Sequence, residues 1–151
     1  MKTLATPWFA GRTSAGVTLG ELIVALAILG LLLALTLPRY KAATDRAAVQ
    51  SAVEDAEGVF GSARRSAITR RTLVAVAIDT ASGSLTIRAA GTRLGFESLG
   101  SQFGVQLGST RDSMSYDARG LGYGAADLSL YVRRGQAAET LFIARLGRVR
   151  H

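Results

Sequence analysis

The sequence predicts an α+β protein in which one long N-terminal helix packs on a small antiparallel β domain. The first observation is an apolar segment from Val17 to Leu37, which is 21 residues long and carries one charge, Glu21. The second is a change in the apolar pattern after Arg71, from intervals of three and four residues to alternation. With 151 residues, the chain has room for one compact domain beside this helix.

The first half of the helix, residues 17–38, is predicted to span a membrane. At about 1.5 Å of rise per residue, such a segment is roughly 31 Å long, close to the ~30 Å hydrocarbon core of a bilayer. Pro38 ends the apolar run. We expect it to kink the helix, because proline lacks the amide donor and crowds the preceding turn.

Residues 39–71 form the predicted amphipathic half of the helix. Apolar side chains recur there at intervals of three and four residues, which makes one stripe of Val49, Val53, Ala56, Phe60, Ala63 and Ala67. The other faces are expected to carry the polar residues Asp45, Glu54, Asp55 and Arg64. The acidic group of Glu54, Asp55 and Glu57 is interpreted as a solvated surface rather than a catalytic site. A soluble domain is expected to cover the apolar stripe.

Residues 72–151 form the predicted β domain. Two hairpins are the strongest signals: 72–78 with 84–88, and 128–132 with 140–144, the latter around a turn at 133–139. Residues 102–107 and 114–117 are predicted as weaker strands. We expect one antiparallel sheet, or a pair of small sheets, with one face buried on the amphipathic half-helix.

The glycines between residues 91 and 124 are expected to form turns and bulges. Residues 118–124 superficially resemble a phosphate-binding loop, but they lack its lysine, its serine or threonine, and a following helix. Asp112, Asp117 and Asp127 do not have the Asp-x-Asp-x-Asp spacing of a calcium loop. We therefore predict neither a metal site nor a cofactor.

The composition argues against an enzyme. The chain has no cysteine, its single histidine is the last residue, His151, and no serine lies in a nucleophile-elbow context. Because no disulfide is available, the fold must depend on its core. The formal net charge is +7, a balance that suits an anionic membrane surface as well as nucleic acid.

Two interpretations fit the start of the apolar segment. Thr18 and Glu21 have the spacing of a capping box, in which each side chain satisfies a free amide of the first turn. The longer pattern Gly16-Val17-Thr18-Leu19-x-Glu21 also resembles the signal of type IV prepilins and type II secretion pseudopilins. The family usually has phenylalanine where this chain has Val17, and a large aliphatic residue where it has Gly20.

The resemblance implies that residues 1–16 are a leader peptide, removed by prepilin peptidase between Gly16 and Val17. Glu21 is then the fifth residue of the processed chain and Pro38 the twenty-second, as in the family. It also implies that the Glu21 carboxylate pairs with the new amine of Val17 during assembly with other pilins. The protein would sit in the bacterial inner membrane with its C-terminal domain in the periplasm. The alternatives are a plain signal anchor or a cleaved secretory signal, for which Ala34-Leu35-Thr36 is a poor site.

The C-terminal part narrows the resemblance. The segments 115–120 and 128–132 and the ending 141–150 are similar to the GspH/FimT family, the H-type minor pseudopilins and FimT minor pilins. The resemblance covers nearly the whole processed chain and implies the type IV pilin-like fold. It also implies a structural role in a type II secretion pseudopilus or a related type IV pilus.

The alternative function is DNA capture for natural transformation. Gly147-Arg148-Val149-Arg150 resembles the Gly-Arg-x-Arg motif of DNA-binding FimT proteins. Two arginines in an extended segment contact consecutive phosphates, and Arg145, Arg133 and Arg134 are expected to enlarge the basic patch. Aromatic residues for base stacking are sparse nearby, with only Tyr131 and Phe142. The simpler interpretation is that these arginines are a solvated terminal strand.

Overall fold

The computed structural model describes residues 16–124, 127–146 and 148–150, and the predicted leader up to residue 15 lies outside them. Contacts divide the chain into two units, residues 1–37 and 38–151. Helix α1, Leu19–Arg70, contributes residues to both. The remaining elements are β1 (Val74–Asp79), β2 (Ser84–Ala89), β3 (Thr92–Ser98), α2 (Leu99–Phe103), β4 (Gln106–Ser109), β5 (Ser113–Tyr116), β6 (Gly122–Tyr123), β7 (Leu128–Arg134), β8 (Ala137–Ile143) and β9 (Val149–Arg150).

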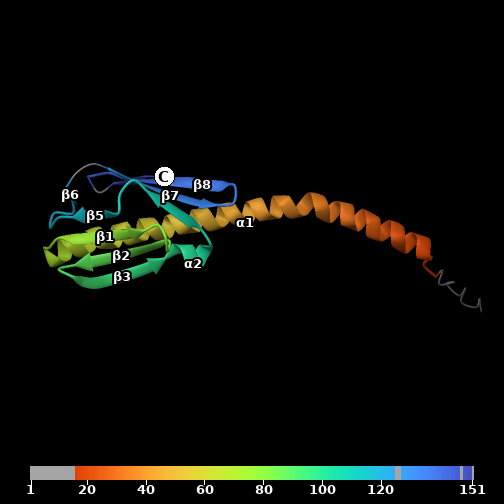
Figure 1. Ribbon diagram of the computed structural model, residues 1–151, viewed down its shortest axis with the longest axis horizontal. Coiled ribbons are helices and arrows are strands. Elements are labelled where there is room, and N and C mark those ends of the chain that lie inside the picture. Colours follow the sequence, from red (N-terminus) through yellow and green to blue (C-terminus); the bar gives the residue numbers. More distant parts are fainter. Residues whose placement is uncertain (1–15, 125–126, 147, 151) are drawn as a thin grey trace, which may run out of the picture. The chain divides into compact units, whose positions relative to one another are not determined.

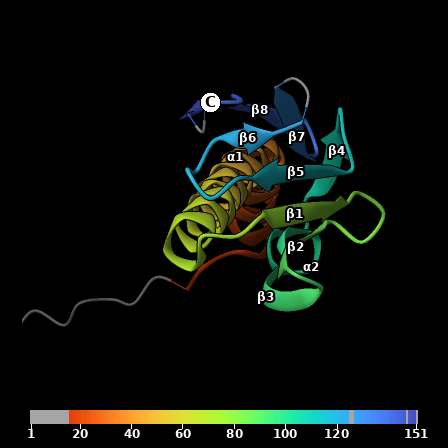
Figure 2. The same cartoon turned by 90° about the vertical axis from the view of Figure 1, so that its left-hand side faces the viewer.

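The β strands form two antiparallel sheets. Sheet A has the order β3-β2-β1-β5-β6, and sheet B has the order β4-β7-β8-β9. Both sheets pack around the second half of α1, with β1–β3 on one side of the helix and β7 and β8 on another (Figures 1 and 2). This is the predicted arrangement of a long helix against a pair of small antiparallel sheets.

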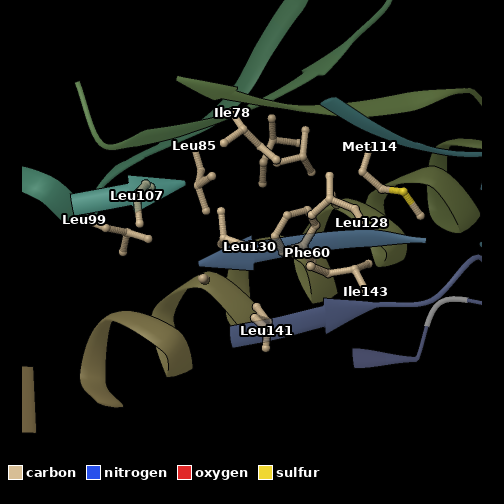
Figure 3. Packing of buried hydrophobic residues seen from close by; sticks show 14 of the residues in the cluster. Phe60, Ile78, Leu85, Leu99, Leu107, Met114, Leu128, Leu130, Leu141 and Ile143 are labelled. Carbon is tan, nitrogen blue, oxygen red and sulfur yellow. The ribbon is translucent and has the colours of Figure 1, made fainter. Parts of the chain in front are cut away.

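The core of the second unit forms where the helix stripe meets the inner faces of the sheets. All six predicted stripe residues are buried, and Phe60 is fully enclosed. Figure 3 shows Phe60 with Leu85 of β2, Leu128 and Leu130 of β7 and Ile143 of β8. Burying side chains of this size stabilises the fold by about 1.5–3 kcal/mol each. The periodicity of the second half of α1 therefore predicted its buried face correctly.

Asp45 corrects one prediction about that helix. It lies on the buried stripe, four residues before Val49, and is 6% exposed rather than on a solvated face. Its carboxylate Oδ1 lies 3.0 Å from Nε of Arg134, at the end of β7. A buried carboxylate requires such a partner, and the partner here is distant in sequence.

The strand predictions need four corrections. The two-residue strand β6 lies where only glycine turns were predicted. The second hairpin turns at Gly135 rather than across residues 133–139, because β7 and β8 continue to Arg134 and from Ala137. Gln102 and Phe103 belong to α2, so the predicted strand 102–107 starts at Gln106 instead. Strand β3 was not predicted. The pairing of β3 with β2 is irregular: Ile87 pairs with Gly95, but the next residue, Arg88, pairs with Arg93. This bulge breaks the alternation of side chains that would mark β3 as a strand.

Two glycines lie in tight turns, and one of them, Gly120, belongs to the range that was predicted to form turns. Gly120 has φ +76° and closes a turn in which its amide donates to the Asp117 carbonyl at 2.9 Å. A Cβ at Gly120 would meet the side chain of Ile68. Gly83 has φ +66° and lies so close to Gly100 that a Cβ there would meet its backbone. Left-handed φ and close approach both favour glycine at these positions.

Candidate functional site

The predicted cleavage position is open in the structure. Gly16 and Val17 precede the first residue of α1, Leu19, and both are exposed. Nothing lies within 4 Å of the position that a Cβ on Gly16 would take, and Val17 is 69% exposed. A peptidase therefore meets no steric barrier from the described residues at this bond.

Thr18 and Glu21 form the capping box that their spacing predicted. The Glu21 amide donates to Thr18 Oγ1 at 3.2 Å, and the Thr18 amide donates to Glu21 Oε2 at 2.9 Å. The Thr18 hydroxyl also donates to Glu21 Oε2, at 3.0 Å. The two side chains thus satisfy two amides that the helix start leaves free. The pairing of Glu21 with the amine of Val17 needs a processed chain, and it stays a prediction.

The first half of α1 exposes a continuous set of large apolar side chains. The most apolar stretch of α1, 18 residues long, has no residue buried within the chain. Among the described residues, α1 is the one helix with the length and composition needed to cross a membrane. Exposed side chains along it include Leu19, Leu22, Ile23, Val24, Leu26, Ile28, Leu29, Leu31, Leu32, Leu33, Leu35 and Leu37. An apolar surface of this extent requires a lipid or protein covering.

Pro38 lies within α1, whose helical assignment continues through it. Thr36 donates its hydroxyl to the Leu32 carbonyl at 3.0 Å, one turn back. The Thr44 hydroxyl bonds the Lys41 carbonyl at 2.8 Å in the same way. The predicted kink is a change in the direction of the helix axis at Pro38, and it stays a prediction.

The C-terminal arginines lie at the edge of sheet B. Arg150 is in β9, opposite Phe142 of β8, and Arg148 precedes this strand. The Arg148 carbonyl accepts a bond from the Ala144 amide at 2.8 Å, which brings the chain back alongside β8. The side chains of Arg145, Arg148 and Arg150 are all exposed. Gly147, the first residue of the motif, lies outside the described residues.

Arg133 and Arg134 point to different sides of β7, and they make different contacts. Arg133 is exposed, and its Nη2 donates to Oε1 of Gln106 at 3.1 Å. Arg134 instead pairs with Asp45 and donates to the Phe103 carbonyl. Arg134 therefore does not share the face of Arg133, and its charge is paired with the Asp45 carboxylate. A contribution of Arg134 to the basic patch stays a prediction.

Two of the three aspartates considered for calcium have local roles. The Asp117 carboxylate accepts from the amides of Leu121 at 2.9 Å and Arg119 at 2.8 Å, and these bonds lower its pKa. Asp127 accepts from the Arg145 amide at 2.9 Å. These carboxylates organise the turn after β5 and the segment after β8.

Comparison with solved structures identifies the fold. The chain is similar to the type IV minor pilin FimU of Pseudomonas aeruginosa strain PAO1 in two crystal forms, with 18% sequence identity to each. The TM-score is 0.58 for the first form, covering 70% of this chain and 88% of FimU. It is 0.55 for the second, covering 67% of this chain and 90% of FimU.

The two kinds of sequence comparison give no match: no protein-family model and no curated protein sequence matches the chain. At 18% identity, the likeness to FimU is one of fold. The long N-terminal helix packed on two antiparallel sheets is therefore the type IV pilin-like fold that the sequence predicted.

Proposed function

We propose that this protein is a minor structural subunit of a type II secretion pseudopilus or a related type IV pilus. The observation that carries the proposal is the exposed apolar half of α1 on a pilin-like fold. In the membrane, lipid covers this surface. In a filament, the apolar helices of neighbouring subunits cover it, so that one helix serves as anchor and as assembly element.

Within this proposal, the N-terminal segment is first cleaved and then takes part in assembly. Prepilin peptidase cuts between Gly16 and Val17, and the Glu21 carboxylate then pairs with the amine of Val17. A charge pair inside an apolar environment fixes subunit register, because an unpaired carboxylate there is costly. The subunit is held in the inner membrane with residues 39–151 in the periplasm, and its partners are other pilins or pseudopilins. We favour an H-type minor pseudopilin role within this class.

Recovery in sheared filaments tests the proposal. The full-length chain is produced in its native host together with the other pilin-like subunits, and its position is followed by immunoblotting. We expect it to resist carbonate extraction from membranes and to co-sediment with sheared filaments. Recovery in the soluble periplasmic fraction would contradict the proposal and favour a cleaved secretory signal. Retention in the membrane under conditions where the other subunits assemble would favour a plain signal anchor.

DNA capture is the second candidate function. It is supported by the exposure of Arg145, Arg148 and Arg150 near one strand edge, and by the lack of ion pairs to them among the described residues. Exposed guanidinium groups bind phosphates with an affinity that falls steeply as salt rises.

A salt series separates the second candidate from assembly alone. Full-length protein in nonionic detergent is titrated with duplex DNA, beside an Arg148→Ala/Arg150→Ala variant. The matched control is Arg88→Ala/Arg93→Ala, which removes two exposed arginines from sheet A. Binding lost only in the first variant would support DNA capture. Equal binding by all three proteins, or no binding at low salt, would show that Arg148 and Arg150 do not bind DNA.

A further inference from the structure

The outer face of sheet B differs from an ordinary solvated sheet surface. Side chains alternate along β4, β7 and β8, so that the inner positions Leu107, Leu128, Leu130, Val132, Leu141 and Ile143 are buried. The outer positions, with Arg150 of β9, are Gln106, Gly108, Ser129, Tyr131, Arg133, Ala138, Thr140, Phe142 and Arg150. Among these described positions there are two arginines and two aromatic residues, and no carboxylate.

The strand register places these four residues along a diagonal, which we call the arginine–aromatic track. Arg133 and Tyr131 are two residues apart on β7, about 7 Å along the strand. Tyr131 lies opposite Thr140, so Phe142 is its diagonal neighbour on β8, at about 7–8 Å. Phe142 lies directly opposite Arg150, at about 5 Å. In the strand register, Arg133 and Arg150 therefore flank the two aromatic positions.

Both aromatic rings are accessible. Tyr131 is 47% exposed and Phe142 is 54% exposed. Gly108 lies opposite Tyr131, and a Cβ on Gly108 would come within 3.6 Å of Tyr131 Cδ2. This is an ordinary van der Waals distance, so the Tyr131 ring lies beside Gly108 on β4, and residue 108 has no side chain to cover it.

A hollow of about 350 Å³ adjoins Tyr131. Its outer-face lining is Gln106, Gly108, Tyr131, Arg133, Ala138 and Thr140. Glu139 also borders this hollow. It belongs to an inner position of β8, and it borders a second hollow on the other side of the sheet, which is lined by residues of α1 such as Arg46 and Val49. Small side chains line the hollow beside an aromatic ring and a guanidinium that Gln106 holds in place. This combination suits a planar, negatively substituted ligand better than a helix of a partner protein.

We infer that the outer face of sheet B binds single-stranded DNA, with Tyr131 and Phe142 stacking on two neighbouring bases and Arg133 and Arg150 contacting the backbone phosphates. Four-stranded sheets that display aromatic side chains bind single strands in this way in other folds. The track is long enough for two or three nucleotides. The inference is independent of filament assembly. It deepens the second candidate function by naming bases, and not only phosphates, as the ligand.

The decisive measurement compares two single strands of equal length and charge. Full-length protein in nonionic detergent is titrated with fluorescein-labelled oligothymidylate and with an abasic deoxyribose-phosphate strand. Base stacking predicts binding to oligothymidylate that is about 10-fold tighter or more, and that keeps this ratio as salt rises. Equal affinity for the two strands would overturn the inference without requiring any variant.

Paired variants locate the site. Tyr131→Ala/Phe142→Ala is expected to weaken oligothymidylate binding by about 10-fold or more, and to leave abasic-strand binding nearly unchanged. The matched control is Tyr123→Ala/Phe96→Ala, which removes one tyrosine and one phenylalanine of similar exposure from β6 and β3, opposite edges of sheet A. Equal loss in the two double variants would overturn the assignment to sheet B.

A third variant keeps this inference separate from the C-terminal arginine proposal. Arg148 precedes β9 and does not belong to the track, so Arg148→Ala is expected to weaken duplex binding while the preference for oligothymidylate over the abasic strand persists. If duplex binding depends on Arg148 and that preference is absent, DNA capture stands and base stacking fails. If no strand binds at low salt, and Tyr131→Ala/Phe142→Ala impairs recovery in sheared filaments, the face is a subunit interface instead.

Discussion

Arg134 Nε lies 3.0 Å from Asp45 Oδ1, and this ion pair ties the helix to the hairpin of sheet B. The same guanidinium donates to the carbonyl of Phe103, the last residue of α2. Gly135 follows with φ +56°, and a Cβ there would collide with the Asp45 carboxylate. One arginine therefore connects α1, α2 and the β7–β8 turn within the second unit.

Replacing Arg134 should destabilise the fold. In Arg134→Ala, the Asp45 side chain, which is 9% exposed, loses its ionic partner, and the Phe103 carbonyl loses a donor. Breaking a buried pair is expensive, but the Arg134 side chain is 38% exposed and solvent screens part of the interaction. We expect a loss of about 1–3 kcal/mol in the free energy of unfolding, measured by urea denaturation in nonionic detergent.

Arg133→Ala is the matched control for this prediction. It removes the neighbouring arginine, which is exposed and bonds Gln106 on the outer face. A surface substitution of this kind should change the free energy of unfolding by less than about 0.5 kcal/mol. Equal effects of the two substitutions would show that the Asp45–Arg134 pair contributes little.

Replacing Gly16 should block removal of the leader. Gly16→Val introduces a branched side chain at the proposed scissile bond, in a position where the described residues leave open space. We expect an uncut precursor in the membrane fraction, seen by electrophoresis and by N-terminal sequencing. Val17→Phe is the control, because it restores the residue that is usual in the family and should be cut normally. Normal processing of Gly16→Val would place the cleavage elsewhere.

Two substitutions separate the roles of Thr18 and Glu21. Glu21→Gln removes the charge, but glutamine still completes a capping box. Thr18→Val keeps the charge and removes the hydroxyl that bonds the Glu21 amide. If Glu21 pairs with the amine of Val17, Glu21→Gln should be processed and fail to assemble, whereas Thr18→Val should assemble. Sheared-filament recovery measures this, and the reverse pattern would favour capping as the only role.

Patterns within one element, and the turns between neighbouring strands, predicted much of this fold, including the β1–β2 and β7–β8 pairings. Side-chain contacts between elements that are distant in the sequence were missed. The intervals from Val49 to Ala67 identified the buried face of α1, and the Thr-x-x-Glu spacing identified the capping box. Both depend on neighbours within one or two helical turns. Asp45 and Arg134 instead read as surface charges, because their burial depends on a partner about 90 positions away. The β7–β8 hairpin was predicted, but the relative placement of Tyr131 and Phe142 needed its exact register, which makes them diagonal neighbours on one face.

The buried phenol of Tyr116 should make the free energy of unfolding depend on pH in the alkaline range. Burial raises its pKa to about 12 from an ordinary value of 10, although the nearby Arg64 guanidinium partly opposes this shift. Because the folded state binds this proton more tightly than the unfolded chain, the contribution to stability is complete below pH 10. It is lost as the pH rises from about 10 to about 12, and its full size is about 3 kcal/mol.

Tyr116→Phe removes this titration and keeps an aromatic ring in the core. We expect the free energy of unfolding of the wild type to fall more steeply between pH 10 and 12 than that of the variant, by up to about 3 kcal/mol at the alkaline end. Urea denaturation across this range measures the difference. The other three tyrosines are exposed and are retained in the variant, so they contribute equally to both curves. Parallel curves would mean that the Tyr116 hydroxyl reaches solvent in the folded protein, since only a desolvated phenol makes folding oppose its ionisation.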